Sequence, residues 1–343
     1  MDQLRKLQSV GYSSLTVSIP RGYAKEMGLK KGDSVLFRED PDGTLRLIPA
    51  TRSERPSRAT IRAEQVESGE ILVELMVGAY ALGYDSIEVA AKDLLGRREA
   101  ELATKTVKRL IGLEVVESDS RRVVGQSFMD PTKFPVDSLI KRLQILVSQS
   151  LDDVVQALDL KQTASLDDVA RVRGQIDELY WLITRQLLVA LSRRDLAAEI
   201  GIESPLHASG DRVTAKTLDE IGALVNEMAN ELVRLKGKGT RMDPEVVAMV
   251  RRLALKAGGA FTKTMESLLA PDVKLIGESM ALVDETLEFE REIAYEMLEK
   301  GERGYARVLV SHFAQLARYC NIIIEIASHR LLRKSSRVAA VQK

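Results

Sequence analysis

Strict alternation of polar and apolar side chains marks the first part of the chain. Residues 14–19 (SLTVSI) alternate at every position, which predicts a β-strand, and shorter strands are predicted at residues 34–38 and 44–48. Pro20 predicts the end of the first strand and the start of a short helix over residues 21–27. The pattern therefore indicates a small β-rich head.

Turn residues separate the elements of this head. Gly28 can end the short helix in a left-handed conformation, Gly32 and Asp33 predict a turn, and residues 41–43 (PDG) predict a hairpin turn. A segment this short buries too little surface to be stable easily on its own. Exchange of hairpins between two chains would supply the missing core, so the head is expected to form a dimer.

Helical periodicity begins after residues 52–58 (RSERPSR), which are charged, interrupted by proline and predicted to be a linker. Amphipathic helices are predicted at residues 68–82 and 97–111, each followed by a glycine, Gly83 and Gly112. The strands predicted around them are residues 59–63, 85–90, 113–116 and 122–126. The order βαβαββ indicates a small α/β sandwich.

The remaining chain is predicted to be helical. Six of the nine prolines lie at or before residue 135, and Leu, Ala and Glu are common after it. Helix starts are indicated at Ser165 with Asp168 and at Asp243 with Pro244. The predicted helices are residues 135–160, 165–200, 211–236, 243–270, 278–300 and 304–333. Glycines at 237 and 239 separate the third helix from the fourth, which suggests a duplicated three-helix bundle.

These patterns predict a multidomain fold class: a small β head of swapped hairpins, an α/β middle domain and an all-α tail of two three-helix bundles. The predicted domains are residues 1–51, 58–131, 135–236 and 243–334.

Charge is distributed unevenly along the 343 residues. The chain has 50 Lys and Arg and 50 Asp and Glu, a formal net charge of zero, which excludes a protein that is basic over its whole surface. Residues 1–58 nevertheless carry +4 and residues 326–343 carry +5, while the body between them is acidic. Contact with an anionic partner is therefore expected at the head and at the C-terminal end.

Cysteine content and hydropathy bear on the compartment. One cysteine, Cys320, excludes a disulfide framework within one chain and fits a reducing environment. The first ten residues lack the apolar core of a signal peptide, and no apolar run reaches the roughly 18 residues of a membrane span. We therefore expect a cytoplasmic protein without membrane insertion.

Three runs in the head carry a family resemblance: residues 11–20 (GYSSLTVSIP), 27–33 (MGLKKGD) and 42–49 (DGTLRLIP). They resemble the AbrB/MazE/SpoVT family of swapped-hairpin DNA-binding domains. The resemblance implies that two chains interleave their hairpins into one barrel and that basic side chains contact DNA. The residues expected to contact DNA are Arg5, Lys6, Ser13, Arg21, Lys25 and Lys30. In the alternative interpretation these charges only solubilise a dimerisation module, and some members of this fold bind a partner protein instead.

Five further runs lie in the middle domain and the helices: residues 83–87 (GYDSI), 110–114 (LIGLE), 176–187 (IDELYWLITRQL), 218–222 (LDEIG) and 316–321 (LARYCN). They resemble PhoU proteins, in the archaeal version that is joined to an AbrB-like head. The resemblance implies a role in phosphate homeostasis, usually as a negative regulator of phosphate uptake.

The same resemblance implies iron or zinc, which PhoU proteins bind through acids four residues apart on a helix. Asp219 keeps the first acid of such a pair, but Ala223 replaces the second, and Ala317 and Asn321 stand at the positions of the second repeat. Two carboxylates at i and i+4 share one helix face and can share a cation, so these replacements remove the paired geometry. The candidate metal ligands that remain are Asp177, Glu178, Asp219, Asp284, Glu288 and Glu292, and solvated surface charge is the alternative interpretation of them.

Other chemistry has little support in the sequence. His207, expected in a loop, and His312 and His329, expected on a helix surface, show no metal-ligand spacing. Cys320 is expected to pack in a core, and Tyr180 and Trp181 are expected to pack in a core or at a dimer interface. No Ser, His and Asp arrangement, paired catalytic acids or phosphate-binding glycine loop is present, so we expect no enzymatic activity.

Two functional hypotheses follow. The first is a homodimeric DNA-binding transcriptional regulator of phosphate homeostasis, in which the helical tail receives a signal or a partner. The second is an adaptor that docks on a phosphate transporter or a sensor kinase and uses the head only for dimerisation, with or without a bound metal.

Overall fold

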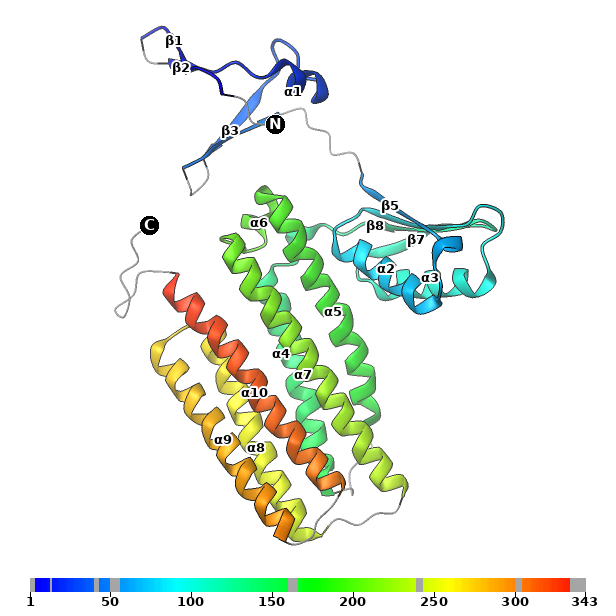
Figure 1. The fold of residues 1–343 in the computed structure, drawn as a ribbon, viewed down its shortest axis with the longest axis vertical. Helices are drawn as coiled ribbons and strands as arrows, with labels where there is room; N and C mark the ends of the chain where they lie inside the picture. Colours follow the sequence, from blue (N-terminus) through cyan, green and yellow to red (C-terminus); the bar gives the residue numbers. More distant parts are fainter. Residues whose placement is uncertain are drawn as a thin grey trace. The chain divides into compact units, whose positions relative to one another are not determined.

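The computed structural model describes residues 4–12, 14–39, 43–49, 56–159, 166–238, 243–299 and 304–333 (Figure 1). The chain divides into two compact units, Met1–Pro56 and Ser57–Lys343. The predicted fold class is confirmed: small β-hairpins form the head, an α/β region follows, and the rest is helical. Within the described residues, no helix is both long and apolar enough to cross a membrane.

Two antiparallel hairpins and one short helix make up the described residues of the head. Its elements are β1 (Gln8–Val10), β2 (Ser14–Thr16), α1 (Arg21–Glu26), β3 (Val35–Glu39) and β4 (Leu45–Pro49). β1 pairs with β2, and β3 pairs with β4. The sequence pattern missed β1, because three residues are too few to show an alternation. Pro41 and Asp42 of the predicted hairpin turn lie outside the described residues.

Two glycines shape the segment between α1 and β3. Gly28, which follows the C-cap residue Met27 of α1, has a φ of +66°, and Gly32 has a φ of +98°, so both adopt the left-handed conformation predicted for the first. The Asp33 side chain closes the turn by accepting a hydrogen bond from the backbone N–H of Lys30 at 2.7 Å. The run MGLKKGD therefore sets the backbone conformation of this turn, and its two lysine side chains are exposed to solvent.

The middle region has the predicted order βαβαββ. Its elements are β5 (Arg58–Arg62), α2 (Gly69–Ala81), β6 (Ser86–Ala90), α3 (Arg97–Arg109), β7 (Leu113–Ser118) and β8 (Arg122–Ser127), with a 3-10 turn at Ala63–Gln65. The sheet order is β5-β6-β8-β7, with β5 and β6 parallel and the other pairs antiparallel. Buried side chains of α2 and α3, among them Met76 and Val107, pack on Ile87 and Val89 of the sheet.

Seven helices follow in the part of the chain that the structure describes. They are α4 (Val136–Gln156), α5 (Leu166–Ser192), α6 (Arg194–Glu199), α7 (Pro205–Gly237), α8 (Pro244–Leu269), α9 (Val273–Glu299) and α10 (Tyr305–Leu332), with 3-10 turns at Pro131–Lys133 and Ala157–Asp159. The start predicted at Asp243 is confirmed, because its side chain accepts a hydrogen bond from the Glu245 N–H at 2.7 Å. Ser165, the other predicted cap, lies outside the described residues.

Three helix predictions were wrong in their bounds. The helix predicted over residues 165–200 is broken at Arg193, whose φ of −124° and ψ of 88° are not helical. The helix predicted to begin at residue 211 begins at Pro205, because Ser204 caps it and accepts a hydrogen bond from the His207 N–H at 3.2 Å. His207 is therefore a buried residue in the first turn of α7 and not a loop residue. The helix predicted over residues 278–300 begins earlier, at Val273.

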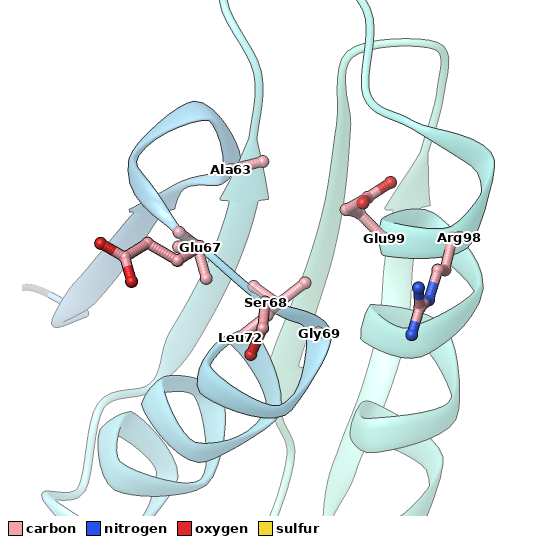
Figure 2. A pocket seen from close by; sticks show the side chains of 8 residues that line it. Ala63, Glu67, Ser68, Gly69, Leu72, Arg98 and Glu99 are labelled. Carbon is pink, nitrogen blue, oxygen red and sulfur yellow. The ribbon is translucent and has the colours of Figure 1, made fainter.

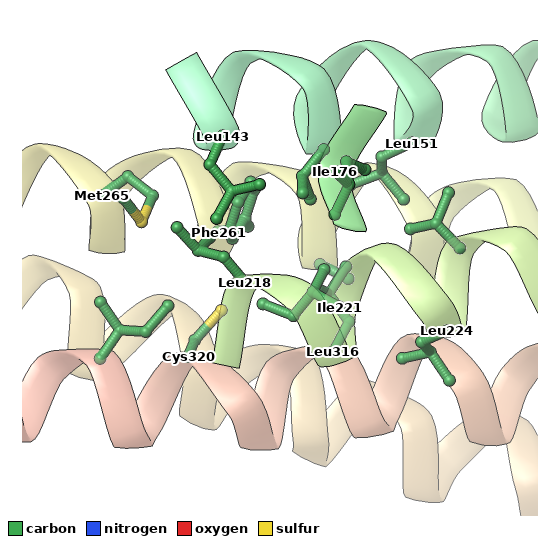
Figure 3. Close-up of a cluster of buried hydrophobic side chains, with 14 of the residues drawn as sticks. Leu143, Leu151, Ile176, Leu218, Ile221, Leu224, Phe261, Met265, Leu316 and Cys320 are labelled. Atoms are coloured by element: carbon green, nitrogen blue, oxygen red, sulfur yellow. The ribbon is translucent and has the colours of Figure 1, made fainter. Parts of the chain in front are cut away.

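The six long helices share one apolar core. Figure 3 shows Leu143 of α4, Ile176 of α5 and Leu218 of α7 facing Phe261 of α8 and Leu316 of α10. The run LDEIG packs tightly against α5, since a Cβ at Gly222 would lie 3.0 Å from the side chain of Ile176. The motif resembling PhoU is thus a helix-packing element.

A buried arginine joins the middle region to the helices. The Arg185 guanidinium on α5 donates hydrogen bonds to the carbonyl oxygens of Tyr80 at 2.6 Å and of Tyr84 at 3.0 Å, and it stacks over the Tyr80 ring. Trp181, one turn earlier, packs against the cores of both regions. Tyr180 is buried beside it. Tyr180 is therefore a core residue, and Trp181 is a partly buried residue that contacts both cores.

We expect Cys320 to be chemically inert in the folded chain. Its side chain is fully buried, and burial raises the pKa of the thiol to about 12, so almost no thiolate is present at neutral pH. A maleimide reagent should modify it only after unfolding, as measured by mass spectrometry with and without denaturant. Rapid modification of the native protein would contradict this core position.

Candidate functional site

Five of the six predicted DNA-contacting residues are described, and they lie before β1, in α1 and in the turn that ends at Asp33. Arg5 and Lys6 precede β1, Arg21 begins α1, Lys25 is in its last turn, and Lys30 follows Gly28. All five residues are exposed. Ser13, the sixth predicted residue, lies outside the described residues. The described side chains are therefore accessible to an anionic partner.

Basic residues outnumber acidic ones in the described head. Eight Lys and Arg stand against Glu26, Asp33 and Glu39, and the Asp33 carboxylate is already engaged by the turn at Lys30. Long, exposed cationic side chains are the groups that contact the DNA backbone and give affinity without sequence preference. The electrostatics of the head therefore suit a polyanion.

Apolar side chains of the head are exposed in the single chain. On one face of the β3–β4 hairpin, Phe37 lies across from Leu47 and Leu45 lies across from Glu39. Phe37 is 55% exposed and Leu45 is 65% exposed, and Leu15 of β2 is 67% exposed. Among the described head residues only Pro49 is buried. One head thus lacks a core of its own, and this apolar surface requires a cover.

Two of the three predicted metal ligands of α5 and α7, Asp177 and Asp219, lie beside cationic side chains. Asp219 is 6% exposed and accepts hydrogen bonds from Arg173 at 2.6 Å and from Lys216 at 3.1 Å. Asp177 lies 3.7 Å from Arg109 of the middle region. Burial, with repulsion from Asp177, raises the pKa of Glu178. The Asp219 carboxylate is therefore part of a structural ion pair with Arg173 and Lys216.

The predicted ligands of α9 are exposed. Asp284, Glu288 and Glu292 follow one another at intervals of one turn on the solvent side of the helix. Among the described residues, none of the six predicted ligands belongs to a group of three ligating side chains. The structure therefore does not gather these six acids, and metal binding by them stays a prediction.

A different cluster, which sequence reasoning missed, lies where α4, α7 and α10 meet. Potential ligand atoms of Asp137, His207 and Asp211 lie within 4.8 Å of one another. His207 Nε2 is 3.3 Å from the Asp211 carboxylate, and Asp211 is 1% exposed. The only local signal was the spacing of His207 and Asp211, which at i and i+4 share a helix face. Asp137 is too distant in sequence to be connected to them by spacing.

Arg330 of α10 holds this cluster together. Its Nη2 donates hydrogen bonds to Asp211 Oδ1 at 2.6 Å and to Asp137 Oδ1 at 3.1 Å, and its Nη1 donates to the Leu268 carbonyl oxygen at 3.3 Å. The arginine side chain is 8% exposed. Arg330 of α10 thus donates hydrogen bonds to α4, α7 and α8. It links helices of the first predicted three-helix bundle to helices of the second.

Protonation of His207 is expected to destabilise the protein. Burial is the main cause that lowers the pKa of His207, and Arg333 and Arg330 lower it further against the opposing effect of Asp211. The unfolded chain therefore binds this proton more readily than the folded chain does. The contribution of neutral His207 to the free energy of unfolding is present above about pH 6.5 and is lost as the pH falls toward the lowered pKa. We expect His207→Gln to reduce this loss, because glutamine can accept from Glu203 N–H and donate to Asp211 without titrating. Urea unfolding of both proteins at about pH 7.5 and about pH 5.5 measures it, and equal pH effects would contradict it.

A small cavity of about 120 Å³ lies beside the first turn of α2 (Figure 2). Ser68 caps that helix and accepts a hydrogen bond from the Ile71 N–H at 3.3 Å. Arg98 and Glu99 line the cavity from the start of α3, so opposite charges face it. No predicted site residue lines it.

The family comparison concerns the head. Residues 8–55 match the family model described as antidote-toxin recognition MazE, bacterial antitoxin. The head is MazE-like. The matched segment of the MazE-like head includes Arg21, Lys25 and Lys30, and it begins two residues after Lys6.

Comparison with solved structures gives a second likeness. The crystal structure of PhoU from Pseudomonas aeruginosa is similar to this chain with a TM-score of 0.42 and 20% sequence identity, over 57% of this chain and 90% of the other. No curated protein matches the chain significantly. The family model thus agrees with the resemblance that the sequence motifs of the head show.

Proposed function

We propose that the chain is a DNA-binding transcriptional regulator of phosphate homeostasis that acts in the cytoplasm as a homodimer. The observation that carries DNA binding is a MazE-like head whose basic side chains are exposed. The assignment to phosphate homeostasis, as a negative regulator of uptake, rests on the runs IDELYWLITRQL, LDEIG and LARYCN, which resemble PhoU. A gel shift with duplex DNA tests it: the full chain retards the duplex, and no retardation at low salt would contradict the proposal.

The predicted domains, residues 1–51, 58–131, 135–236 and 243–334, have different roles in this proposal. The head binds DNA, and the two helical domains bind a signal or a signalling partner. A ligand that prefers one arrangement of the helices would shift the population of DNA-binding dimers, since a ligand shifts an equilibrium only by its differential affinity for the states.

Dimerisation through the head is expected to depend on its exposed apolar face. Phe37→Asp would place a charge opposite Leu47 on this face, so a dimer that buries it should dissociate. Lys31→Asp, at an exposed turn residue, is the matched control. Analytical ultracentrifugation should find monomers for Phe37→Asp and dimers for Lys31→Asp. A Phe37→Asp chain that stays dimeric would place the dimer interface elsewhere.

A second function is an adaptor whose head recognises protein. The observation in its favour is the description of the matched family, which names toxin recognition by an antitoxin. The helical unit would then dock on a phosphate transporter or a sensor kinase. A chain with Arg5→Glu and Lys6→Glu that still restrains phosphate uptake in cells would support the adaptor over the DNA-binding regulator.

A further inference from the structure

Helix α2 carries apolar side chains on two faces. One face, which includes Leu72 and Met76, is buried in the core of the middle region. The outer face presents Ile71, Leu75 and Leu82 to solvent, and these side chains are 43%, 47% and 65% exposed. A surface helix normally has a polar outer face, and a helix that is apolar all round is normally buried. The outer face of α2 is therefore suited to a second contact.

The exposed apolar residues form one line with an open notch in it. Ile71, Leu75, Gly78 and Leu82 follow one another at intervals of four, three and four residues, so they lie along one side of the helix. Leu82 is the C-cap residue, and its φ of −69° and ψ of −4° keep it on this line. A Cβ at Gly78 would meet no atom within 4 Å, so the space over this glycine is free in the single chain. We name these four residues the α2 stripe.

The α2 stripe is complementary to itself. A two-fold axis midway between Leu75 and Gly78 places Leu75 of each copy opposite Gly78 of the other, in an antiparallel pair of helices. The same axis places Ile71 opposite Leu82. Each leucine then enters the space over a glycine, as a knob enters a hole. A two-fold contact requires one patch to fit a second copy of itself, so this symmetry favours a second copy of the chain over an unrelated helix.

The acidic side chains of α2 are compatible with this pairing. Glu70 and Glu74 are exposed on one side of the α2 stripe and do not interrupt it. With the same axis, Glu74 stands opposite Ala79 of the second copy, and Glu70 stands opposite Gly83. No carboxylate directly faces another, so the contact avoids the repulsion of paired like charges.

The size of the α2 stripe shows that it needs a tether. Four residues a side are far fewer than the roughly 20–30 of a stable interface, so the stripe alone does not hold two chains together. Residues 50–57 separate β4, which ends at Pro49, from β5, which begins at Arg58. A connection of this length spans at most about 30 Å, so chains joined at their heads keep their middle regions close to each other. The contact between them is then intramolecular, at an effective concentration of up to about millimolar.

We propose that α2 makes the second contact of the homodimer, in which the α2 stripes of two chains pack antiparallel around a two-fold axis. This inference rests on the head-linked dimer of the proposed function. Arg185 of α5 bonds to the Tyr80 carbonyl oxygen within α2, so the helices that receive a signal are fixed to the helix that makes the contact. A ligand with different affinities for the paired and unpaired arrangements would shift the population between them.

Cysteine cross-linking of the full chain tests the proposal. Glu74→Cys places a thiol at the edge of the α2 stripe, and the two thiols of an antiparallel pair lie on the same side of it, so a short bismaleimide should join the chains. Glu285→Cys, at an exposed glutamate of α9, is the matched control. Cys320 is buried in both proteins. On a denaturing gel we expect at least about 10-fold more cross-linked dimer for Glu74→Cys than for the control.

A second substitution separates this contact from the head. Leu75→Glu, added to Glu74→Cys, places a carboxylate over Gly78 of the other chain and should reduce the cross-link at least about 10-fold. Analytical ultracentrifugation should still find a dimer, held by the head. If dimeric Glu74→Cys cross-links no more than Glu285→Cys, or if Leu75→Glu leaves the cross-link unchanged, the α2 contact is refuted and the head dimer stands. A monomeric unsubstituted chain would refute both.

Discussion

Replacing Arg330 by methionine is expected to lower the free energy of unfolding by about 3–5 kcal/mol. Methionine fills most of the volume of the arginine stem but leaves the carboxylate of Asp211, which is 1% exposed, without its cation. It also removes the hydrogen bonds to Asp137 of α4 and to the Leu268 carbonyl oxygen of α8. Urea unfolding monitored by circular dichroism measures the loss.

The matched control is Arg318→Met on the same helix. The Arg318 side chain is 51% exposed and lies 3.9 Å from Glu290, and exposed pairs of this kind contribute little, so a change below about 1 kcal/mol is expected. If both variants lost the same small amount of stability, the cluster at Arg330 would not be what ties the helices together.

Reversing two charges at the start of the head is expected to have the largest effect on DNA binding. Arg5→Glu with Lys6→Glu replaces two exposed cations in each chain, hence four in a dimer. If all four contact phosphates, the slope of log affinity against log salt should become shallower by about 4, and affinity at low salt should fall at least about 100-fold. Fluorescence anisotropy with a labelled duplex measures both quantities.

An equal charge change elsewhere is the control for this variant. Arg97 and Arg98 are adjacent exposed arginines at the start of α3, where acidic side chains are favourable for the helix dipole. Arg97→Glu with Arg98→Glu should therefore fold and bind DNA nearly as the unchanged chain does. Equal losses from the two double variants would mean that only overall charge matters and that the head is not the contact.

Local sequence signals predicted the elements well where the signal is contained in a few neighbouring residues. Asp243 before Pro244, Gly28 after α1 and the order of strands and helices in the middle region were all confirmed. The start of α7 was missed because the cap at Ser204 and Pro205 precedes an unremarkable run, LHASG, without regular apolar spacing.

The polar cluster was beyond reach of the sequence for a different reason. Asp137, His207 with Asp211, and Arg330 come from three helices, and only packing brings them together. Conversely, Asp219 looked like a metal ligand by its motif, and only the structure shows Arg173 and Lys216 on its carboxylate. Spacing identifies residues on one helix face, but not which other helix supplies their partners.

The central claim is that the head of this chain binds DNA through exposed basic side chains, and a salt titration tests it most directly. The full chain is titrated onto a labelled mixed-sequence duplex at several salt concentrations from about 50 to 200 mM. We predict binding at low salt, with log affinity that falls linearly with log salt and with a shallower slope for Arg5→Glu with Lys6→Glu. Absence of binding at the lowest salt, or affinity that does not change with salt, would contradict the claim.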